Sequence, residues 1–251
     1  MSPRPNDERK MKTILCFGDS NTWGYDPDAS LASPSPVRHP HDVRWTGVLA
    51  RELGAGWCVI EEGQNGRTTV FDDPLVPHRK GRDYLPAALE SHKPLDAVVL
   101  MLGTNDTKLV FSAPATQIAE GAGVLAKIIL GSDAGPAAQA PEGTQAPKEM
   151  PTPQQTPAPQ SPRAPKLLLV APAAVGPFAL LPDLEEKFAG AEAKTKRFPM
   201  LYRRLAGTLG CAFLNAQDHA QPSRMDGIHF DAASHLALGR AIAEEVAKLQ
   251  T

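Results

Sequence analysis

Three residues that lie far apart in the sequence have side chains suited to acyl transfer: Ser20, Asp226 and His229. A serine hydroxyl becomes an effective nucleophile when a neighbouring imidazole takes its proton and a carboxylate orients that imidazole. Only two residues separate Asp226 from His229. One turn can therefore hold the carboxylate against one ring nitrogen while the other nitrogen faces Ser20. Taken alone, the turn at Ser20 fits a helix cap as well as a nucleophile.

The tetrahedral intermediate of such a reaction needs hydrogen-bond donors that point at its oxygen. The sequence offers three candidates for this oxyanion hole, which are the backbone N–H of Ser20, the backbone N–H of Gly66 and the side-chain amide of Asn105. A glycine at position 66 lets the backbone approach a substrate closely. Asn105 also fits a cap of the helix that follows, and Asp106 is expected to have a structural role.

Alternating apolar runs and amphipathic stretches predict one domain that positions these residues. Strands are expected at residues 12–17, 57–61, 96–102, 166–171 and 212–215, and helices at 43–54, 83–92, 115–130, 189–209 and 232–249. Asp42, Gly54 and Asp231 are the expected helix caps. Strands that alternate with helices form a parallel sheet with right-handed crossovers. The fold class is therefore α/β, with three layers (α/β/α) around a five-stranded parallel sheet.

The candidate residues all leave the carboxyl ends of these strands. In an open parallel sheet, ligands bind beyond that edge. Ser20 follows the first strand, Gly66 the second and Asn105 the third, while Asp226 and His229 follow the fifth. Their coincidence on one edge favours a catalytic site over a set of unrelated caps.

Four sequence blocks resemble those of the GDSL, or SGNH, hydrolase family, in the family's order. The blocks are Gly18-Asp19-Ser20, Asn65-Gly66-Arg67-Thr68-Thr69, Gly103-Thr104-Asn105-Asp106 and Asp226-Gly227-Ile228-His229. The resemblance implies a flavodoxin-like sheet of order 2-1-3-4-5. It implies Ser20, Gly66, Asn105 and His229 as signature residues, with Asp226 completing the triad, and no metal or other cofactor. Asn21 departs from the family pattern, which has Leu at that position.

Residues 42–49, and residues 61–63 together with 67–69, resemble the bacterial arylesterase and acyltransferase branch, in which homo-oligomers are common. The resemblance implies a serine esterase for small carboxylic esters with short acyl or aryl groups, with acyl transfer to alcohols as an additional activity. A carbohydrate O-deacetylase with the same triad is the alternative. The substrate-binding residues expected from their positions are Asn21, Trp23, Tyr25 and Phe178. Core packing suits Trp23 and Tyr25 equally well, and a subunit contact is the alternative for Phe178.

Composition restricts partners and location. The formal net charge of −2 and the lack of a basic stripe argue against nucleic acid as a partner. No apolar run reaches the length of a membrane span, and the polar N-terminus lacks the apolar core of a secretory signal. Cys16, Cys58 and Cys211 are expected to be buried thiols rather than disulfides. The expected location is the cytoplasm.

Two segments fall outside the domain layout. Residues 1–11 are expected to form a flexible tail before a single domain at 12–251. Residues 134–165 carry repeated prolines and no apolar periodicity, which predicts a disordered insertion on the edge opposite the site. A non-catalytic binding or scaffolding protein that recruits a partner through this insertion is the alternative from another functional class.

Overall fold

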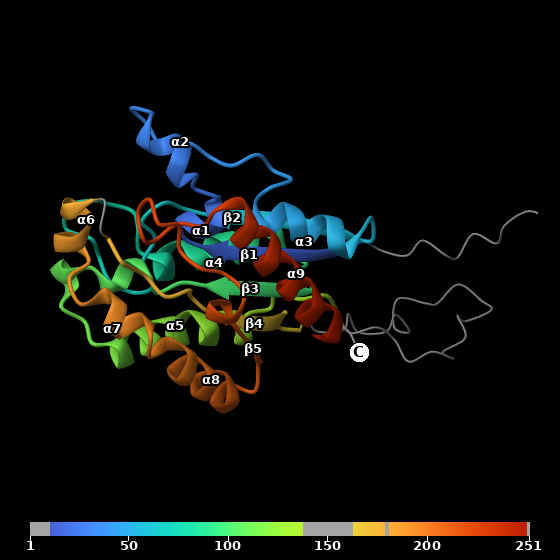
Figure 1. Cartoon of the computed structure of the whole chain (residues 1–251). Coiled ribbons are helices and arrows are strands. Elements are labelled where there is room, and N and C mark those ends of the chain that lie inside the picture. Colours follow the sequence, from blue (N-terminus) through green and yellow to red (C-terminus); the bar gives the residue numbers. More distant parts are fainter. Residues whose placement is uncertain (1–10, 138–162, 179–180, 250–251) are drawn as a thin grey trace, which may run out of the picture.

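Five of the predicted apolar runs form one parallel sheet in the computed structural model, which describes residues 11–137, 163–178 and 181–249 (Figure 1). The strands are β1 (Lys12–Gly18), β2 (Trp57–Gly63), β3 (Ala97–Met101), β4 (Lys166–Ala171) and β5 (Ala212–Asn215). Their order is β2-β1-β3-β4-β5, and each neighbouring pair is parallel. The predicted fold class and strand order are therefore confirmed.

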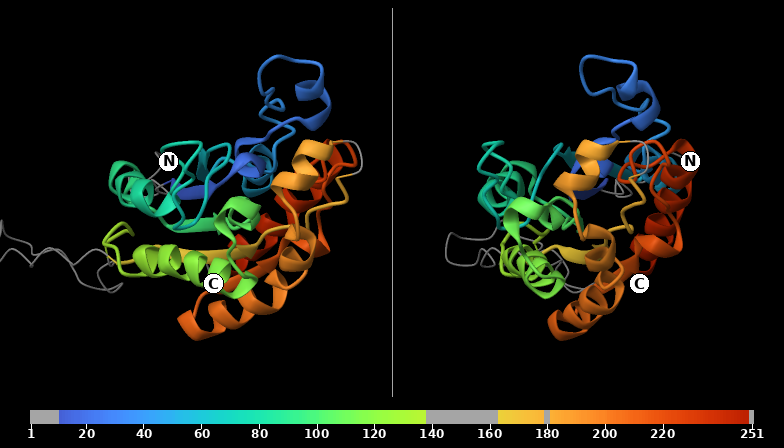
Figure 2. Two further views of the ribbon diagram at one scale, coloured as in Figure 1. Left: turned by 90° about the vertical axis from the view of Figure 1, so that its left-hand side faces the viewer. Right: turned by 60° about the vertical axis from the view of Figure 1, so that its left-hand side comes forward.

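Helices cover both faces of the sheet (Figures 1 and 2). The longer ones are α3 (Trp45–Leu53), α4 (Gly81–His92), α5 (Ala115–Leu130), α8 (Phe198–Leu209) and α9 (Ala232–Leu249). The shorter ones are α1 (Ser20–Trp23), α2 (Pro27–Leu31), α6 (Pro182–Lys187) and α7 (Ala191–Thr195), with 3-10 turns η1 (Asn105–Thr107), η2 (Leu109–Phe111) and η3 (Ala216–Asp218). Helices α3 and α9 pack together on one face, and α4, α5 and α8 cover the other.

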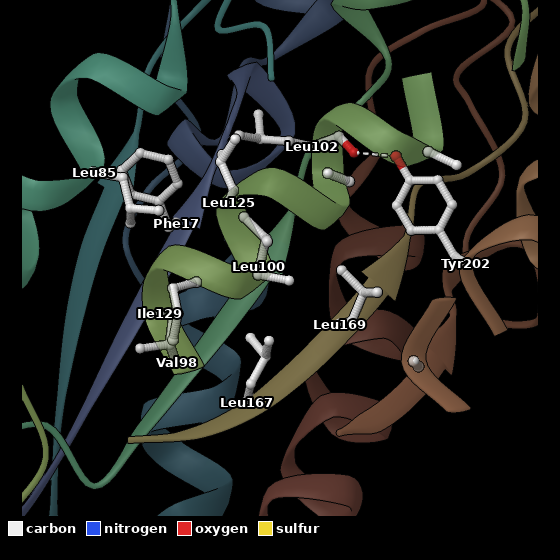
Figure 3. Packing of buried hydrophobic residues seen from close by; sticks show 14 of the residues in the cluster. Phe17, Leu85, Val98, Leu100, Leu102, Leu125, Ile129, Leu167, Leu169 and Tyr202 are labelled. Atoms are coloured by element: carbon white, nitrogen blue, oxygen red, sulfur yellow. Dashed lines mark hydrogen bonds between the residues drawn. The ribbon is translucent and has the colours of Figure 1, made fainter. Parts of the chain in front are cut away.

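Alternate residues of the strands enter different cores, because successive side chains of a strand point to opposite faces. Leu15 and Phe17 of β1 pack towards α4, α5 and α8, whereas Ile14 and Cys16 pack towards α3 and α9. Figure 3 shows the first of these cores, in which side chains of β1, β3 and β4 meet those of α4 and α5. Each fully buried aliphatic side chain contributes about 1.5–3 kcal/mol relative to an exposed one. The two cores therefore hold the strand ends, and the loops that leave them, in fixed positions.

One predicted helix is divided in the structure. In place of a single helix at residues 189–209, α7 and α8 follow each other as separate helices. Gly190 has a φ of 76° before α7, and Pro199 lies in the first turn of α8, where its missing N–H costs no helical hydrogen bond. The C-cap predicted at Gly54 is confirmed, and Asp231 accepts a hydrogen bond from the Ser234 N–H at 2.8 Å.

Two other details differ from expectation. Helix α3 begins after Arg44 rather than at a cap by Asp42. All three cysteines are free, but Cys58 is exposed and only Cys16 is buried. Cys58 lies on β2, an edge strand whose residues are covered only in part.

The flanks of the proline-rich segment belong to the fold. The carbonyl of Ala134 accepts a hydrogen bond from the Leu95 N–H at 2.7 Å, and Gly135 N–H donates to the Arg163 carbonyl at 2.6 Å. These contacts lie just before β3 and β4, at the amino ends of the strands. The prediction of disorder is therefore wrong at the two ends of the segment, residues 134–137 and 163–165. The rest of the segment, residues 138–162, lies outside the described residues. The predicted tail, residues 1–11, also lies outside the described residues, apart from Met11, which is exposed.

Two buried charged side chains connect the loops that leave β1, β2 and β3. The guanidinium of Arg67 donates to the carbonyls of Gly18 (2.9 Å) and Glu62, and it lies 4.2 Å from the ring centre of Phe17. Asp106 accepts hydrogen bonds from the Thr69 N–H at 2.9 and 3.1 Å and from the Thr69 hydroxyl. Burial lowers the pKa of Arg67 to about 10, which still leaves it protonated at neutral pH.

Burial also raises the pKa of Asp106 to about 6, despite the hydrogen bonds from Thr69. The folded protein therefore holds this proton more tightly than the unfolded chain does. Because of this, Asp106 makes the folded state lose stability as pH rises from about 4 to about 6. Asp106→Asn removes that loss. Between about pH 4.5 and 7, the free energy of unfolding of the wild type should fall by about 2 kcal/mol more than that of the variant.

Urea unfolding of both proteins at the two pH values measures this difference. Asp42→Asn, the same change at an exposed loop carboxylate, is the matched control and should follow the wild type. Parallel pH dependence of the wild type and Asp106→Asn would contradict the prediction.

Candidate active site

Ser20 lies in a tight turn at the carboxyl end of β1, an interior strand of the sheet. Asp19 caps α1, and its carboxylate accepts the Asn21 N–H at 3.0 Å. A side chain at Gly18 would overlap the Thr22 hydroxyl, since a Cβ built there lies 2.0 Å from it. Helix α1 ends after one turn at Gly24, which has a φ of 88°. The glycines thus allow strand, turn and helix to follow one another so closely that the direction of the Ser20 side chain is fixed.

The structure brings the three predicted triad residues together in one chain of hydrogen bonds. Ser20 Oγ lies 2.8 Å from Nε2 of His229, and Nδ1 of His229 lies 2.5 Å from Oδ2 of Asp226. The other carboxylate oxygen accepts the N–H groups of Ile228 and His229, each at 2.9 Å. Gly227 has a φ of 69°, which allows this turn to close. Burial raises the pKa of Asp226, but the hydrogen bonds and charge of His229 outweigh it, so the net pKa lies below its usual value.

Tyr25 supports the imidazole of His229 from one side. The two rings stack with their centres 3.9 Å apart and their planes at 24°. This contact restricts rotation of the His229 ring about its own axis, so its nitrogens stay aligned with Ser20 and Asp226. Tyr25 also lines the cavity next to Ser20, as predicted for a substrate-binding residue.

The three predicted oxyanion donors face the same cavity. Gly66 occupies the third position of a turn closed by the Arg67 N–H and the Gln64 carbonyl at 3.1 Å, and its φ of 80° suits that position. Within the described chain, the backbone N–H groups of Ser20 and Gly66 donate to no protein acceptor. Asn105 donates one amide hydrogen to the Arg67 carbonyl at 3.2 Å, which leaves its second hydrogen for a ligand.

A cavity of about 330 Å³ opens above Ser20. The segment around α2, which projects from the body in Figures 1 and 2, forms one side through Pro27, Leu31 and Pro36. Apolar residues in and beside α6 form another, namely Leu181, Leu184 and Phe188. A larger hollow of about 520 Å³ beside Glu62 and Tyr84 contains neither Ser20 nor His229. The smaller cavity is therefore the one in which the triad can meet a ligand.

Asn21, predicted to bind substrate, instead holds the histidine loop. Its side chain donates to the Ile228 carbonyl and accepts the Phe230 N–H, both at 3.2 Å, and the residue is 4% exposed. A buried amide is stable only when its donors and acceptors are paired, and here both pair with the chain on either side of His229. The polar residue in place of the family's Leu thus connects the serine turn to the histidine turn.

Trp23 and Phe178, which were also predicted to bind substrate, are not among the described residues that line the cavity. The Trp23 ring packs under the guanidinium of Arg38, 5.3 Å from its centre. Phe178 stacks on Phe188 with ring centres 5.9 Å apart and lies against Gly227, where an added Cβ would approach it to 3.1 Å. Phe178 therefore packs against the Asp226–His229 turn.

Sequence reasoning missed the charged residues at the cavity. Lys108 reaches it while paired with Asp73 at 2.8 Å, and both side chains are almost fully buried. Arg79 and Lys187 also line it. Lys108 stands two residues after Asp106, so its place beside a motif block was a usable signal. Arg79 and Lys187 come from loops and a short helix with no local pattern that points to the site.

The described residues contain neither a metal-binding cluster nor a membrane-spanning helix. Within 11–137, 163–178 and 181–249, no three His, Cys, Asp or Glu side chains are arranged to bind a metal ion. None of the helices in these ranges has both the length and the apolar character needed to cross a bilayer.

The chain is similar to several esterases of known structure from bacteria. A model of the GDSL-like lipase/acylhydrolase family matches residues 16–237. Among solved structures, the carbohydrate acetylesterase Est24 from Sinorhizobium meliloti is 41% identical, with a TM-score of 0.80, over 95% of this chain and 99% of that one. An aryl esterase from M. smegmatis is 40% identical, with a TM-score of 0.80 and the same coverage.

A putative arylesterase from Agrobacterium tumefaciens is 37% identical, with a TM-score of 0.73, over 95% of this chain and 100% of that one. The comparison with curated proteins finds no match. Because the family model spans most of the residues and the solved structures align over almost their full length, the chain belongs to the GDSL-like lipase/acylhydrolase family, also called the SGNH hydrolases.

Proposed function

We propose that this carboxylic ester hydrolase acts on small esters through an acyl-enzyme formed on Ser20. The observation that carries the proposal is the continuous hydrogen-bonded chain from Asp226 through His229 to Ser20, which ends in a cavity lined by unpaired donors. Serine, imidazole and carboxylate in this geometry perform acyl transfer on unrelated folds.

The reaction follows from these positions. His229 Nε2 takes the proton of the Ser20 hydroxyl as Oγ bonds to the ester carbonyl carbon, and Asp226 stabilises the imidazolium that forms. The carbonyl oxygen becomes an oxyanion and accepts hydrogen bonds from Ser20 N–H, Gly66 N–H and the Asn105 amide. His229 then gives its proton to the departing alcohol. Water attacks the acyl-enzyme by the same steps in reverse and releases the acid and Ser20.

Small substrates suit the cavity, since its volume is about 330 Å³ and the segments at α2 and α6 line it with aliphatic side chains. Transfer of the acyl group to an alcohol remains part of this proposal, because an apolar wall favours an alcohol over water at the acyl-enzyme. The ratio of transfer product to acid, measured with a vinyl ester and a primary alcohol in water, tests that part. If only the acid forms at high alcohol concentration, acyl transfer to alcohols is ruled out.

A carbohydrate O-deacetylase is the second candidate, and the resemblance to Est24 favours it. Comparing kcat/KM for acetylated sugars and for aryl acetates separates the two. A much higher kcat/KM for the acetylated sugars would favour the deacetylase over the short-chain esterase.

A scaffolding role through the proline-rich segment is the candidate from another class. Because residues 134, 135 and 163 are hydrogen-bonded parts of the fold, the deletion that tests it is 138–162. Full esterase activity after the deletion would show that catalysis does not need residues 138–162. The homo-oligomer stays a prediction, which the mass from light scattering of the purified protein tests.

Replacing the nucleophile gives the most direct test of the mechanism. Ser20→Ala should lower kcat for p-nitrophenyl acetate by at least about 10⁴-fold, because no other group can form the acyl-enzyme. Ser91→Ala, the same change at an exposed serine of α4, should keep the wild-type rate. Equal hydrolysis by the wild type and Ser20→Ala would disprove the proposal.

The oxyanion role of Asn105 predicts a different kinetic pattern. Asn105→Ala should reduce kcat about 10²-fold or more and leave KM nearly unchanged, because the second amide hydrogen contributes mainly in the transition state. Asn105→Asp should lose more activity, since an anion then faces the developing oxyanion. Steady-state kinetics of both variants measure these effects. A raised KM with normal kcat would instead assign Asn105 to ground-state binding.

A further inference from the structure

The cavity that contains Ser20 has more positive than negative side chains. Arg79, Lys108 and Lys187 line it, whereas Asp226 is the one acidic residue among its described lining residues. The whole chain has a formal net charge of −2, so this excess is local to the cavity. Two of the four charges are already compensated, because Lys108 pairs with Asp73 at 2.8 Å and Asp226 pairs with His229 at 2.5 Å. The charges of Arg79 and Lys187 are the two without such a compensating partner in the described chain.

Neither Arg79 nor Lys187 has a side-chain hydrogen bond or ion pair with any other residue of the described chain. The Arg79 Nε atom is buried from solvent and still has no acceptor. A buried charged donor without an acceptor is costly, and natural structures usually supply a partner. Here the partner can come from the ligand, because Arg79 lines the cavity.

Arg79 lies directly beside the proposed oxyanion donors. A Cβ built on Gly66 would lie 3.6 Å from both Cδ and Nε of Arg79, so the arginine stem packs against the Gly66 backbone. The main chain at this point is also fixed, since the Arg79 carbonyl accepts the Thr68 N–H at 2.9 Å and the Thr68 hydroxyl at 3.3 Å. The guanidinium is therefore held close to the place where the ester carbonyl must bind.

Lys187, the last residue of α6, lines the same cavity. Burial and the nearby charge of Lys108 lower its pKa, and Asp73 offsets this only in part. An ammonium that has lost some of its water and stands near another cation gains more from an incoming anion than a fully hydrated one does.

We propose that Arg79 and Lys187 recognise an anionic oxygen group on the substrate, so that the preferred esters carry a carboxylate or phosphate in their acyl or alcohol part. This inference rests on the proposed esterase function. It makes Arg79 a specificity-determining residue whose guanidinium can bind two oxygens of such a group. A neutral ester uses the same triad but leaves both cations without a partner.

The experiment compares esters of similar shape in which a carboxylate replaces an uncharged group. For the acyl side, the pair is mono-p-nitrophenyl adipate and p-nitrophenyl hexanoate, and for the alcohol side it is 4-acetoxybenzoate and 4-acetoxybenzamide. In at least one pair, the wild type should have the higher kcat/KM for the anionic ester, and added salt should reduce that preference. The pair that shows the preference identifies the side on which the anion lies.

Variants then assign the preference to residues. Arg79→Gln should lower the anionic-to-neutral ratio of kcat/KM about tenfold, the effect of losing one hydrogen bond between charged groups. Lys187→Gln should lower it less, and Arg79→Lys should restore part of it. Arg82→Gln, an exposed arginine of α4 outside the cavity, is the matched control and should leave the ratio and both rates unchanged.

Two results would overturn the inference: no preference in the wild type for either anionic ester, or an equal loss for both esters of a pair in Arg79→Gln. The second result would make Arg79 only a support for Gly66. Failure of the proposed esterase function has a different signature, because none of the four esters would then be hydrolysed. Calorimetric titration of Ser20→Ala with 4-hydroxybenzoate and 4-hydroxybenzamide would still test for the anion site, and equal binding of the two would reject it.

Discussion

The buried guanidinium of Arg67 fixes the distance between two loops that supply the reaction centre. It donates to the carbonyl of Gly18, where β1 ends before the serine turn, and to that of Glu62, where β2 gives way to the Gly66 turn. The Phe17 ring lies against its face. A cation that bridges two carbonyls away from water cannot move without losing hydrogen bonds that nothing else replaces. The relation of Ser20 to the N–H of Gly66 depends on this contact.

The remaining loops are joined in the same manner, each by a polar residue next to one with a proposed role in the chemistry. Asp106 binds the backbone of Thr69, and its neighbour Asn105 binds the Arg67 carbonyl. Asn21 binds the chain on both sides of His229. The motif blocks therefore contain two kinds of residues, which are groups that face the substrate and groups that hold one block to the next. These polar contacts explain how four loops with little regular structure can form a precise site.

The sequence predicted the sheet and the reacting groups because both depend on local rules. Apolar runs of the right length become strands, and polar residues at their carboxyl ends meet on one edge. These local rules did not predict which residues line the cavity. Asn21 and Trp23 follow Ser20 closely in sequence, and Phe178 lies in the loop after β4. Their side chains nevertheless point to Ile228, Arg38 and Gly227, which only the folded arrangement brings near. Similarly, the break between α7 and α8, just before Pro199, divides a helix that periodicity alone extends over residues 189–209.

The placement of the triad along the chain has a consequence for how activity arises during folding. Ser20 leaves the first strand, whereas its imidazole partner stands 209 positions later, after the last strand and just before α9. Closing so long a segment is entropically costly, so contacts of this kind form late. A chain that is still being synthesised can build β1, β3 and their helices, but it does not yet contain the base that activates Ser20. Recovery of turnover after dilution from denaturant therefore reports the docking of the final loop and helix, not the collapse of the sheet.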